Sequence, residues 1–167
     1  MESFIGWIGG KRMLRKAILE RFPTDEVGRY IEVFGGAAWV LFAKEKKANQ
    51  LEVYNDINSN LVNLFRCVKY HCGELQREME WMLTSREQFF DCLAQGQGRG
   101  LTDIQRAARF FYTVKISFGC DNRTYATSSK QVDNAVEYLE KVRERLRGVN
   151  IENKDFADLI KVYDRPT

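Results

Sequence analysis

The stretch Tyr30-Ile31-Glu32-Val33-Phe34-Gly35-Gly36 decides the fold class of this chain. Its first five residues are typical of a short strand, two glycines follow, and residues 37–46 then have the pattern of a helix. A second strand, Leu51-Glu52-Val53-Tyr54, ends at Asn55-Asp56 and is followed by a helical pattern over residues 60–70. The alternation of strand and helix predicts a parallel α/β sheet.

Beyond residue 70 the sequence becomes mostly helical. The expected elements on either side of this change are an N-terminal helix at 12–21, two helices that begin at the capping boxes Ser85-x-x-Gln88 and Thr102-x-x-Gln105, a loop or hairpin at 119–129, an amphipathic helix at 131–147, a strand at 149–152 and a short helix at 156–163. We therefore expect an α/β domain made of residues 1–70 and 148–167, divided by a helical insert at 71–147.

The composition is that of one globular domain. The chain has 167 residues, of which 44% are hydrophobic and 29% charged, and no apolar run is long enough to span a membrane. The N-terminus lacks the pattern of a secretory signal, so we expect a cytoplasmic protein without a membrane partner. The four cysteines form no C-x-x-C pair, and His71 is the only histidine, so we expect neither a metal site nor a catalytic triad.

Positive charge is concentrated between residues 104 and 131. The basic residues there are Arg106, Arg109, Lys115, Arg123 and Lys130, against one acid, Asp121, and aromatic residues are interleaved with them. This combination is typical of a nucleic-acid-binding surface. A core helix with a solvated basic face would explain the pattern equally well.

The two strand ends carry residues that suit a nucleotide-like ligand. Gly35 and Gly36 would allow close approach of a ligand to the backbone, although a tight turn also explains them. Asp56 lies 21 residues after Gly35, about the offset at which an acid binds ribose hydroxyls in dinucleotide-binding sheets. The alternative for Asp56 is a helix N-cap, for which Asn58 and Ser59 compete.

A third string, Trp7-Ile8-Gly9-Gly10-Lys11, could cradle an anion, although it lacks the spacing of a P-loop. Together the three strings resemble the DNA adenine-N6 methyltransferases whose target-recognition insert precedes the catalytic motif. That family has Trp-x-Gly-Gly-Lys, Glu-Pro-Phe-x-Gly and Asn-Asp-x-Asn in this order, and Val33 stands where the proline is usual. Residues 107–112, residues 117–126 and the pair Asp155-Phe156 resemble the insert and the segment after it.

The resemblance implies a partial Rossmann-like methyltransferase sheet, S-adenosylmethionine as cofactor and double-stranded DNA as partner, with a role such as restriction–modification. The cofactor site would comprise Trp7, Gly10, Lys11, Phe34, Gly35, Gly36, Asp56, Asp155 and Phe156. Asp155 would also accept a hydrogen bond from an adenine amino group, although it could equally be an ordinary helix N-cap. The DNA contacts would come from Arg109, Lys115, Asn122, Arg123 and Lys130.

The chain departs from this family at its catalytic string, which is Asp-Pro-Pro-Tyr or a close relative. The only prolines are Pro23 and Pro166, so these 167 residues contain no Pro-Pro. We therefore expect a chain that stops before the motif and is inactive alone, with an open sheet edge that self-associates or contacts a second polypeptide. The alternatives are a non-catalytic remnant that binds DNA or cofactor, one half of a split enzyme, and an unrelated nucleotide-binding domain; the lack of G-x-G-x-x-G counts against the last.

Overall fold

A parallel sheet forms one part of the molecule, as the sequence predicts. The computed structural model describes residues 1–24, 27–126 and 132–164. Its three strands are β1 (Arg29–Glu32), β2 (Leu51–Asn55) and β3 (Val149–Glu152), all parallel and in the order β1-β2-β3. β3 is 94 residues further along the chain than the end of β2, so the helical segment between them is a long crossover.

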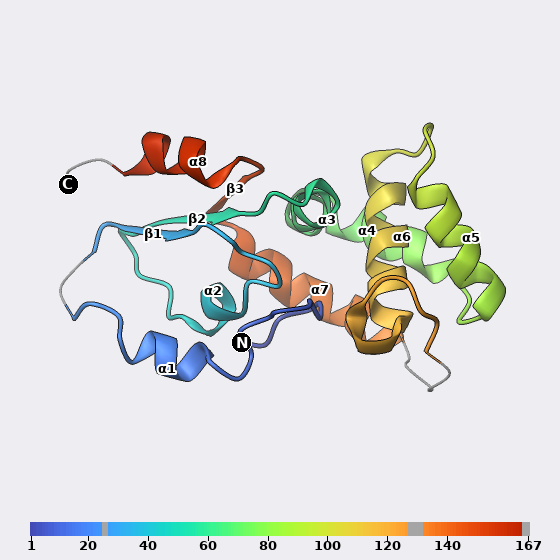
Figure 1. Ribbon diagram of the computed structural model, residues 1–167, viewed down its shortest axis with the longest axis horizontal. Helices are drawn as coiled ribbons and strands as arrows, with labels where there is room; N and C mark the ends of the chain where they lie inside the picture. Colours follow the sequence, from blue (N-terminus) through green and yellow to red (C-terminus); the bar gives the residue numbers. More distant parts are fainter. Residues whose placement is uncertain (25–26, 127–131, 165–167) are drawn as a thin grey trace.

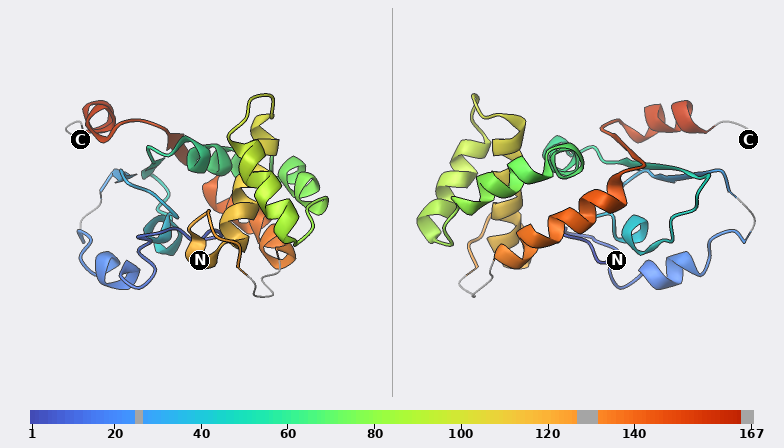
Figure 2. Two further views of the ribbon diagram at one scale, coloured as in Figure 1. Left: turned by 45° about the vertical axis from the view of Figure 1, so that its right-hand side comes forward. Right: turned by 180° about the vertical axis from the view of Figure 1, so that it is seen from behind.

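The helices form two groups around this sheet. In chain order the helices are α1 (Arg15–Leu19), α2 (Trp39–Ala43), α3 (Ser59–Tyr70), α4 (Cys72–Glu80), α5 (Arg86–Gly96), α6 (Asp103–Ile116), the 3₁₀ turn η1 (Phe118–Cys120), α7 (Asp133–Leu146) and α8 (Phe156–Tyr163). Helix α8 lies over one face of the sheet, and α1 and α2 lie on the other side (Figure 1). Helices α4, α5 and α6 gather at the far end of the molecule, with α3 and α7 between them and the sheet (Figures 1 and 2).

The helix expected over residues 37–46 is shorter than predicted. Ala38 has a left-handed backbone (φ 53°), so α2 begins only at Trp39, and Lys44 is extended, so it ends at Ala43. The expected helix at 12–21 is likewise reduced to Arg15–Leu19. The side chains of Ser85 and Thr102 cap α5 and α6 by accepting from the N–H groups of Gln88 and Gln105, but only Thr102 and Gln105 form the complete capping box that was predicted at both positions, because the Gln88 side chain donates to Cys92 instead.

One continuous hydrophobic core joins the sheet to the helices. The ring of Phe65 on α3 stacks on Tyr54 of β2, with ring centroids 4.1 Å apart, and Phe4 lies edge-on to Phe65 at 5.0 Å. Phe4 also contacts Phe111 of α6, with centroids 5.9 Å apart. The N-terminal segment therefore connects the sheet to the helical region, and the two regions pack as one unit.

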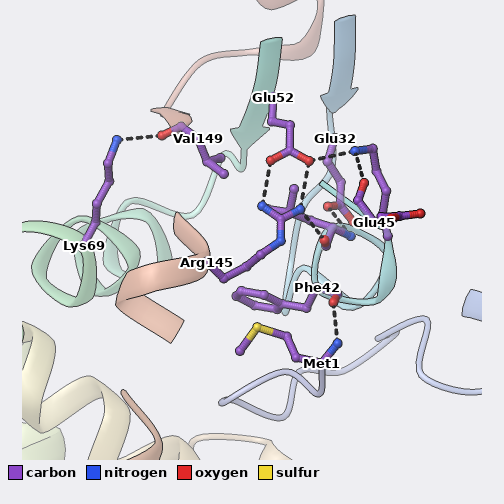
Figure 3. A network of polar contacts seen from close by, with 10 residues as sticks. Met1, Glu32, Phe42, Glu45, Glu52, Lys69, Arg145 and Val149 are labelled. Atoms are coloured by element: carbon purple, nitrogen blue, oxygen red, sulfur yellow. Dashed lines mark hydrogen bonds and ion pairs between the residues drawn. The ribbon is translucent and has the colours of Figure 1, made fainter. Parts of the chain in front are cut away.

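A buried ion network fixes α7 to the sheet (Figure 3). Glu52 of β2 is 1% exposed, and it accepts two hydrogen bonds from Arg145 of α7, at 2.6 and 2.8 Å, and one from Lys44 at 2.8 Å. Burial acts to raise the pKa of Glu52, but these two cations hold it below its ordinary value. Arg145 also donates to the carbonyl oxygen of Leu41 in α2 at 2.8 Å, so one guanidinium joins three elements.

Strand β1 lies at an edge of the sheet. It pairs with β2 on one side, and within the described residues no strand pairs with its other side. A mainly apolar cavity of about 400 Å³ that includes Phe22 and Tyr30 lies beside it, and a second of about 420 Å³ includes Ile31 and Val33. The expected open edge is therefore present, with apolar surface on both sides of the strand.

Candidate functional site

The three strands end at the same edge of the sheet, where a single buried side chain ties them together. The amide nitrogen of Asn55, at the end of β2, donates to the carbonyl oxygens of Val33 at 2.9 Å and Lys154 at 3.0 Å. Its amide oxygen accepts from the N–H of Lys154 at 2.8 Å, and the residue is 1% exposed. Asn55 thereby sets the relative positions of the loops that follow β1, β2 and β3, and ligands of parallel sheets bind at such an edge.

Asp56 follows Asn55 and faces the loop after β1. One of its carboxylate oxygens accepts from the N–H of Gly36 and the other from the N–H of Asn58, both at 2.8 Å. Asn58, not Asp56, caps helix α3, because its side chain accepts from Asn60 and Leu61. The N-cap alternative for Asp56 is therefore wrong, and each of its oxygens retains lone pairs for a further donor.

The glycine pair has a packing role and a conformational role. A Cβ atom at Gly35 would lie 2.3 Å from the ring of Tyr54, so a side chain cannot be accommodated there. Gly36 has φ +48°, and its carbonyl oxygen accepts from the Tyr54 hydroxyl at 2.8 Å. The tight turn considered for these glycines is present, and it directs the N–H of Gly36 to Asp56.

A cavity of about 270 Å³ lies at this edge and brings the three sequence strings together. Among the predicted cofactor residues, those that line it are Trp7, Gly10, Lys11, Phe34, Gly35, Gly36 and Asp56. The ammonium of Lys11 donates to the carbonyl oxygen of Gly9 at 2.8 Å and is exposed. The N-terminal loop and two strand ends, which are far apart in the sequence, thus form one cavity.

Glu32 and Trp39 are among the residues of this cavity that were not predicted to belong to the site. Burial raises the pKa of Glu32 to about 7, against the lowering effect of hydrogen bonds from the Leu41 N–H and the Tyr30 hydroxyl. The guanidinium groups of Arg12 and Arg15 lie over the Trp39 ring. The signal in the sequence that could have indicated Glu32 is its place as the first residue of the string that resembles Glu-Pro-Phe-x-Gly.

Asp155 and Phe156 lie at the same edge of the sheet but do not line this cavity. Asp155 is exposed and caps helix α8, since its carboxylate accepts from the N–H of Ala157 at 2.9 Å. The N-cap role is therefore observed, and the adenine contact stays a prediction. The rings of Phe156 and Phe34 lie 5.8 Å apart, and both are exposed, at 49% and 76%.

The basic residues of α6 differ in the contacts that they make with other side chains of the protein. Arg109 donates to the Glu78 carboxylate at 3.1 Å and to the Gln95 amide oxygen at 2.6 Å, so it connects α6 to α4 and α5. Lys115 lies over the Phe111 ring at 5.6 Å. Lys130 lies outside the described residues.

The loop after α6 holds Asn122 and Arg123 next to a second cavity. An antiparallel bridge between Ser117 and Tyr125 closes this loop, which agrees with the expected loop or hairpin. A cavity of about 250 Å³ beside it is lined by Asn122, Arg123 and Arg106, among others. The Nε atom of Arg106 and the Oδ1 atom of Asn122 are buried and have no hydrogen-bond partner among the described residues.

The structure contains neither a group of metal-binding side chains nor a membrane-spanning helix in the part of the chain that it describes. No three His, Cys, Asp or Glu residues are clustered as metal ligands there, and no helix combines the length and apolar character needed to cross a membrane.

Comparison with known proteins connects this site to one family. The chain is 29% identical to the type II methyltransferase M1.LlaDCHI of Lactococcus lactis subsp. cremoris over 98% of its own length and 55% of that protein. It is 25% identical to the type II methyltransferase M.MjaIII of Methanocaldococcus jannaschii over 71% of its own length and 38% of that protein. The chain thus matches about half, or less, of the length of these relatives. The sequence model of the D12 class N6 adenine-specific DNA methyltransferases matches residues 7–166, and the chain belongs to this family.

Proposed function

We propose that this chain is the cofactor-binding and DNA-recognition part of a site-specific DNA adenine-N6 methyltransferase that uses S-adenosylmethionine. The observation that carries the proposal is the cavity at the strand ends, because three separate sequence strings of the family converge on it. Membership of the family supports the same conclusion.

The donors and acceptors of the cavity fit this cofactor. Asp56 has acceptor lone pairs for two ribose hydroxyls, while Gly36 and Asn58 hold its carboxylate in place. Lys11 supplies a cation for the carboxylate of the methionine part. The cofactor, when bound, would supply an electrophilic methyl group. The aromatic rings of Phe34 and Phe156 meet at the adjoining edge, where a planar base can stack.

The helical region of residues 71–147 is proposed to read DNA. Arg123 and Asn122 are placed on a loop, where they can reach a partner, and unpaired polar atoms of Arg106 and Asn122 lie in the neighbouring part of the structure. Buried polar atoms without partners are rare in proteins and are explained when a ligand completes them. Arg109, by contrast, is proposed to hold the helices in place and only indirectly to support DNA binding.

The polypeptide of these 167 residues is proposed to transfer no methyl group by itself. In the family, Asp-Pro-Pro-Tyr holds the amine of an adenine that is flipped out of the duplex. No such string occurs in the sequence, and the exposed carboxylate of Asp155 already caps α8. A non-catalytic protein that binds DNA or cofactor would have the same site. Only a measurement of methyl transfer distinguishes it from part of a methyltransferase.

Calorimetry with S-adenosylmethionine tests the proposed cofactor site. We expect binding that Asp56→Ala weakens about ten- to a hundredfold, because a charged acceptor of two hydrogen bonds is lost. Lys11→Ala should weaken binding less, since its ammonium is exposed. Asp158→Ala, an exposed acid on α8, is the matched control and should bind normally. Equal heats for wild type and Asp56→Ala would contradict the assignment.

A second candidate, one half of a split enzyme, is favoured by the free edge of β1. The apolar cavities on its two sides fit a strand with apolar side chains on both faces, as buried parallel strands have. The test mixes the chain with a polypeptide that carries the remaining part of a relative. Complex formation with methyl transfer, reduced by Val27→Asp at the edge, would support it. Absence of a complex would contradict it.

A further inference from the structure

The cavity of about 250 Å³ beside the loop after α6 has a charged lining unlike that of the strand-end cavity. It lies between α5, α6, that loop and the start of α3, and α5 and α6 run side by side (Figures 1 and 2). Its charged lining residues are Arg106, Arg109 and Arg123, and among the described residues no Asp or Glu lines it. The strand-end cavity, by contrast, includes Glu32 and Asp56. The lining of this arginine cavity therefore favours an anionic ligand.

The three arginines differ in how much of their hydrogen-bonding capacity is used within the protein. Arg109 donates to side chains of both α4 and α5, as described above. Arg106 donates from one terminal nitrogen to the carboxylate of Asp103 at 2.9 Å, and this ion pair is exposed. The Nε atom of Arg106 is buried and has no partner within the part of the chain that the structure describes. Arg106 thus retains a buried donor for a ligand, and Arg123 retains an exposed charge.

The loop after α6 adds a neutral amide to the same cavity. The backbone of Asn122 is left-handed (φ 55°), and its N–H donates to the hydroxyl of Ser117 at 3.0 Å, so the loop holds this residue in place. The Oδ1 atom of Asn122 is buried and unpaired among the described residues. A half-turn of the amide exchanges this acceptor for the NH₂ donor. Arg106 and Asn122 then offer two donors to one anion, which would give both orphan groups a partner.

The position of the arginine cavity favours DNA as the source of this anion. Phe110 lines the arginine cavity and Trp7 lines the strand-end cavity, and the centroids of their rings are 5.9 Å apart. Asn60, at the start of α3, also lines the arginine cavity and follows Asp56 closely in the chain. A DNA strand whose target base approaches the bound cofactor would therefore pass close to the arginine cavity, and each of its phosphates carries a negative charge.

We propose that the arginine cavity binds one backbone phosphate of DNA near the target base, with Arg106 and Arg123 as its cations and Asn122 as a neutral donor. The inference rests on the proposed function, because it takes DNA as the partner. It adds Arg106, which is absent from the DNA contacts that the family resemblance implies, and it leaves Arg109 to hold the helices together. A phosphate contact positions the duplex and carries no sequence information, so the effect is expected on DNA of any sequence.

Fluorescence anisotropy with a labelled duplex of arbitrary sequence, over a salt series, tests this contact. Arg106→Gln should flatten the log–log dependence of affinity on salt by about one unit and weaken binding several-fold at low salt. Arg106→Lys keeps the charge but lacks the Nε donor, so it should restore the slope and only part of the affinity. Both variants lose at most an exposed ion pair, and thermal unfolding checks that they fold.

Arg77→Gln is the matched control. Arg77 of α4 forms an exposed ion pair with Glu74 at 2.9 Å and with the same i,i+3 spacing as Arg106 and Asp103, but it does not line the arginine cavity. Its substitution removes the same charge and should leave the salt slope unchanged. An equal loss in Arg77→Gln and Arg106→Gln would mean that general charge, and not the cavity, accounts for the effect.

A double substitution tests whether Arg106 and Arg123 bind the same phosphate. Residues that share a partner have coupled effects, whereas independent contacts multiply. The loss of affinity in Arg106→Gln/Arg123→Ala should therefore be smaller than the product of the two single losses. A full product would place the two arginines on different phosphates and overturn the single site.

The remaining outcomes separate this inference from the proposed function. If the unaltered chain binds no DNA at low salt, the proposed DNA-recognition function fails. DNA binding that is identical in Arg106→Gln, or affinity fully restored by Arg106→Lys, would overturn the phosphate contact and leave the proposed function standing. Inorganic phosphate is the last arm. Thermal stabilisation by phosphate that Arg106→Gln removes, together with unchanged DNA binding, would assign the cavity to a free anion and overturn the proposal.

Discussion

The edge of the sheet and the basic stretch of α6 both carry residues that the sequence marks as functional, but the structure treats them differently. At the edge, Gly36 and Asp56 are held by backbone hydrogen bonds, and their site is formed by the ends of adjacent strands. In α6, Arg109 is bound to Glu78 and Gln95 on neighbouring helices. Arg123, only 14 residues later, is exposed on a loop.

The difference follows from how each signal arises. Parallel strands end at one edge whatever their separation in sequence, so topology alone brings strand-end residues together. A basic residue on a helix faces a direction set by the helical period, and that direction can be solvent or a neighbouring acid. Positive charge along a helix is therefore a less specific sign of a DNA-binding surface than a motif at a strand end is of a ligand site.

The largest expected effect concerns methyl transfer. It tests whether the sheet edge and the helical region are together sufficient for activity. We expect no transfer of tritium from labelled S-adenosylmethionine to unmethylated DNA by this polypeptide alone. Each missing preorganised polar contact typically costs about 10²- to 10³-fold in rate, and several are absent together. A full-length family enzyme is the positive control. Incorporation well above background would show that Asp155 or Asp164 does the work of the missing string.

Substitution of Asn55 tests how far the strand-end site depends on one buried side chain. Asn55→Leu removes three hydrogen bonds and leaves two carbonyl oxygens and an N–H without their partner, which should lower the free energy of unfolding by about 2–4 kcal/mol. Chemical denaturation measures this. Asn153→Ala, an exposed residue that donates to the Asp56 carbonyl, should cost much less. Equal losses would mean that Asn55 does not join the strand ends in solution.

The pH dependence of stability sharpens the comparison, because Glu32 lies at the edge and its pKa is raised to about 7 from 4.5. Below pH 4.5 Glu32 is protonated in both the folded and the unfolded chain. As the pH rises towards 7 the unfolded chain loses this proton first, so the contribution of Glu32 to stability is lost. The ligand-free protein should lose on the order of 2 kcal/mol across this window, relative to Glu32→Gln. Parallel pH profiles of the two proteins would contradict the raised pKa.

Arg123 and Arg109 provide the smallest effects and a direct test within the helical region. Arg123→Ala should reduce the salt dependence of DNA binding by about one unit in log–log slope and leave stability unchanged. Arg109→Ala should instead lower the unfolding free energy by roughly 1–3 kcal/mol, because Glu78 and Gln95 lose their partner. Fluorescence anisotropy over a salt series and denaturation measure the two. The reverse pattern would exchange the roles of the two arginines.

Most of the fold follows from sequence patterns, and the exceptions have local causes. The three strands and helices such as α3, α6 and α8 lie where periodicity and caps predict them. Helix α2 is short because Ala38 is left-handed and Lys44 is drawn to Glu52, a partner whose position depends on tertiary structure. A contact of this kind is absent from any local pattern.

The candidate site is predictable to a similar degree. Motif strings indicated the residues around Gly36 and Asp56, and the structure brings them together. Trp39 was missed because it faces the cavity from a helix, which a helix pattern does not reveal, and Glu32 was missed although it opens the string that resembles Glu-Pro-Phe-x-Gly. The role of Asn55 was missed because its partners, Val33 and Lys154, lie in the loops that follow other strands.

The hydrogen bonds of Asn55 have a consequence for how this site can change. Because one amide sets the positions of three loops, a substitution that shifts it would move Asp56, the glycine turn and the Asp155 loop at once. Under the proposed function, binding of the cofactor and orientation of the target base would then be correlated properties. Variants in the three loops would change cofactor binding and base orientation separately only if Asn55 is kept. Substitution of Asn55 would change both together.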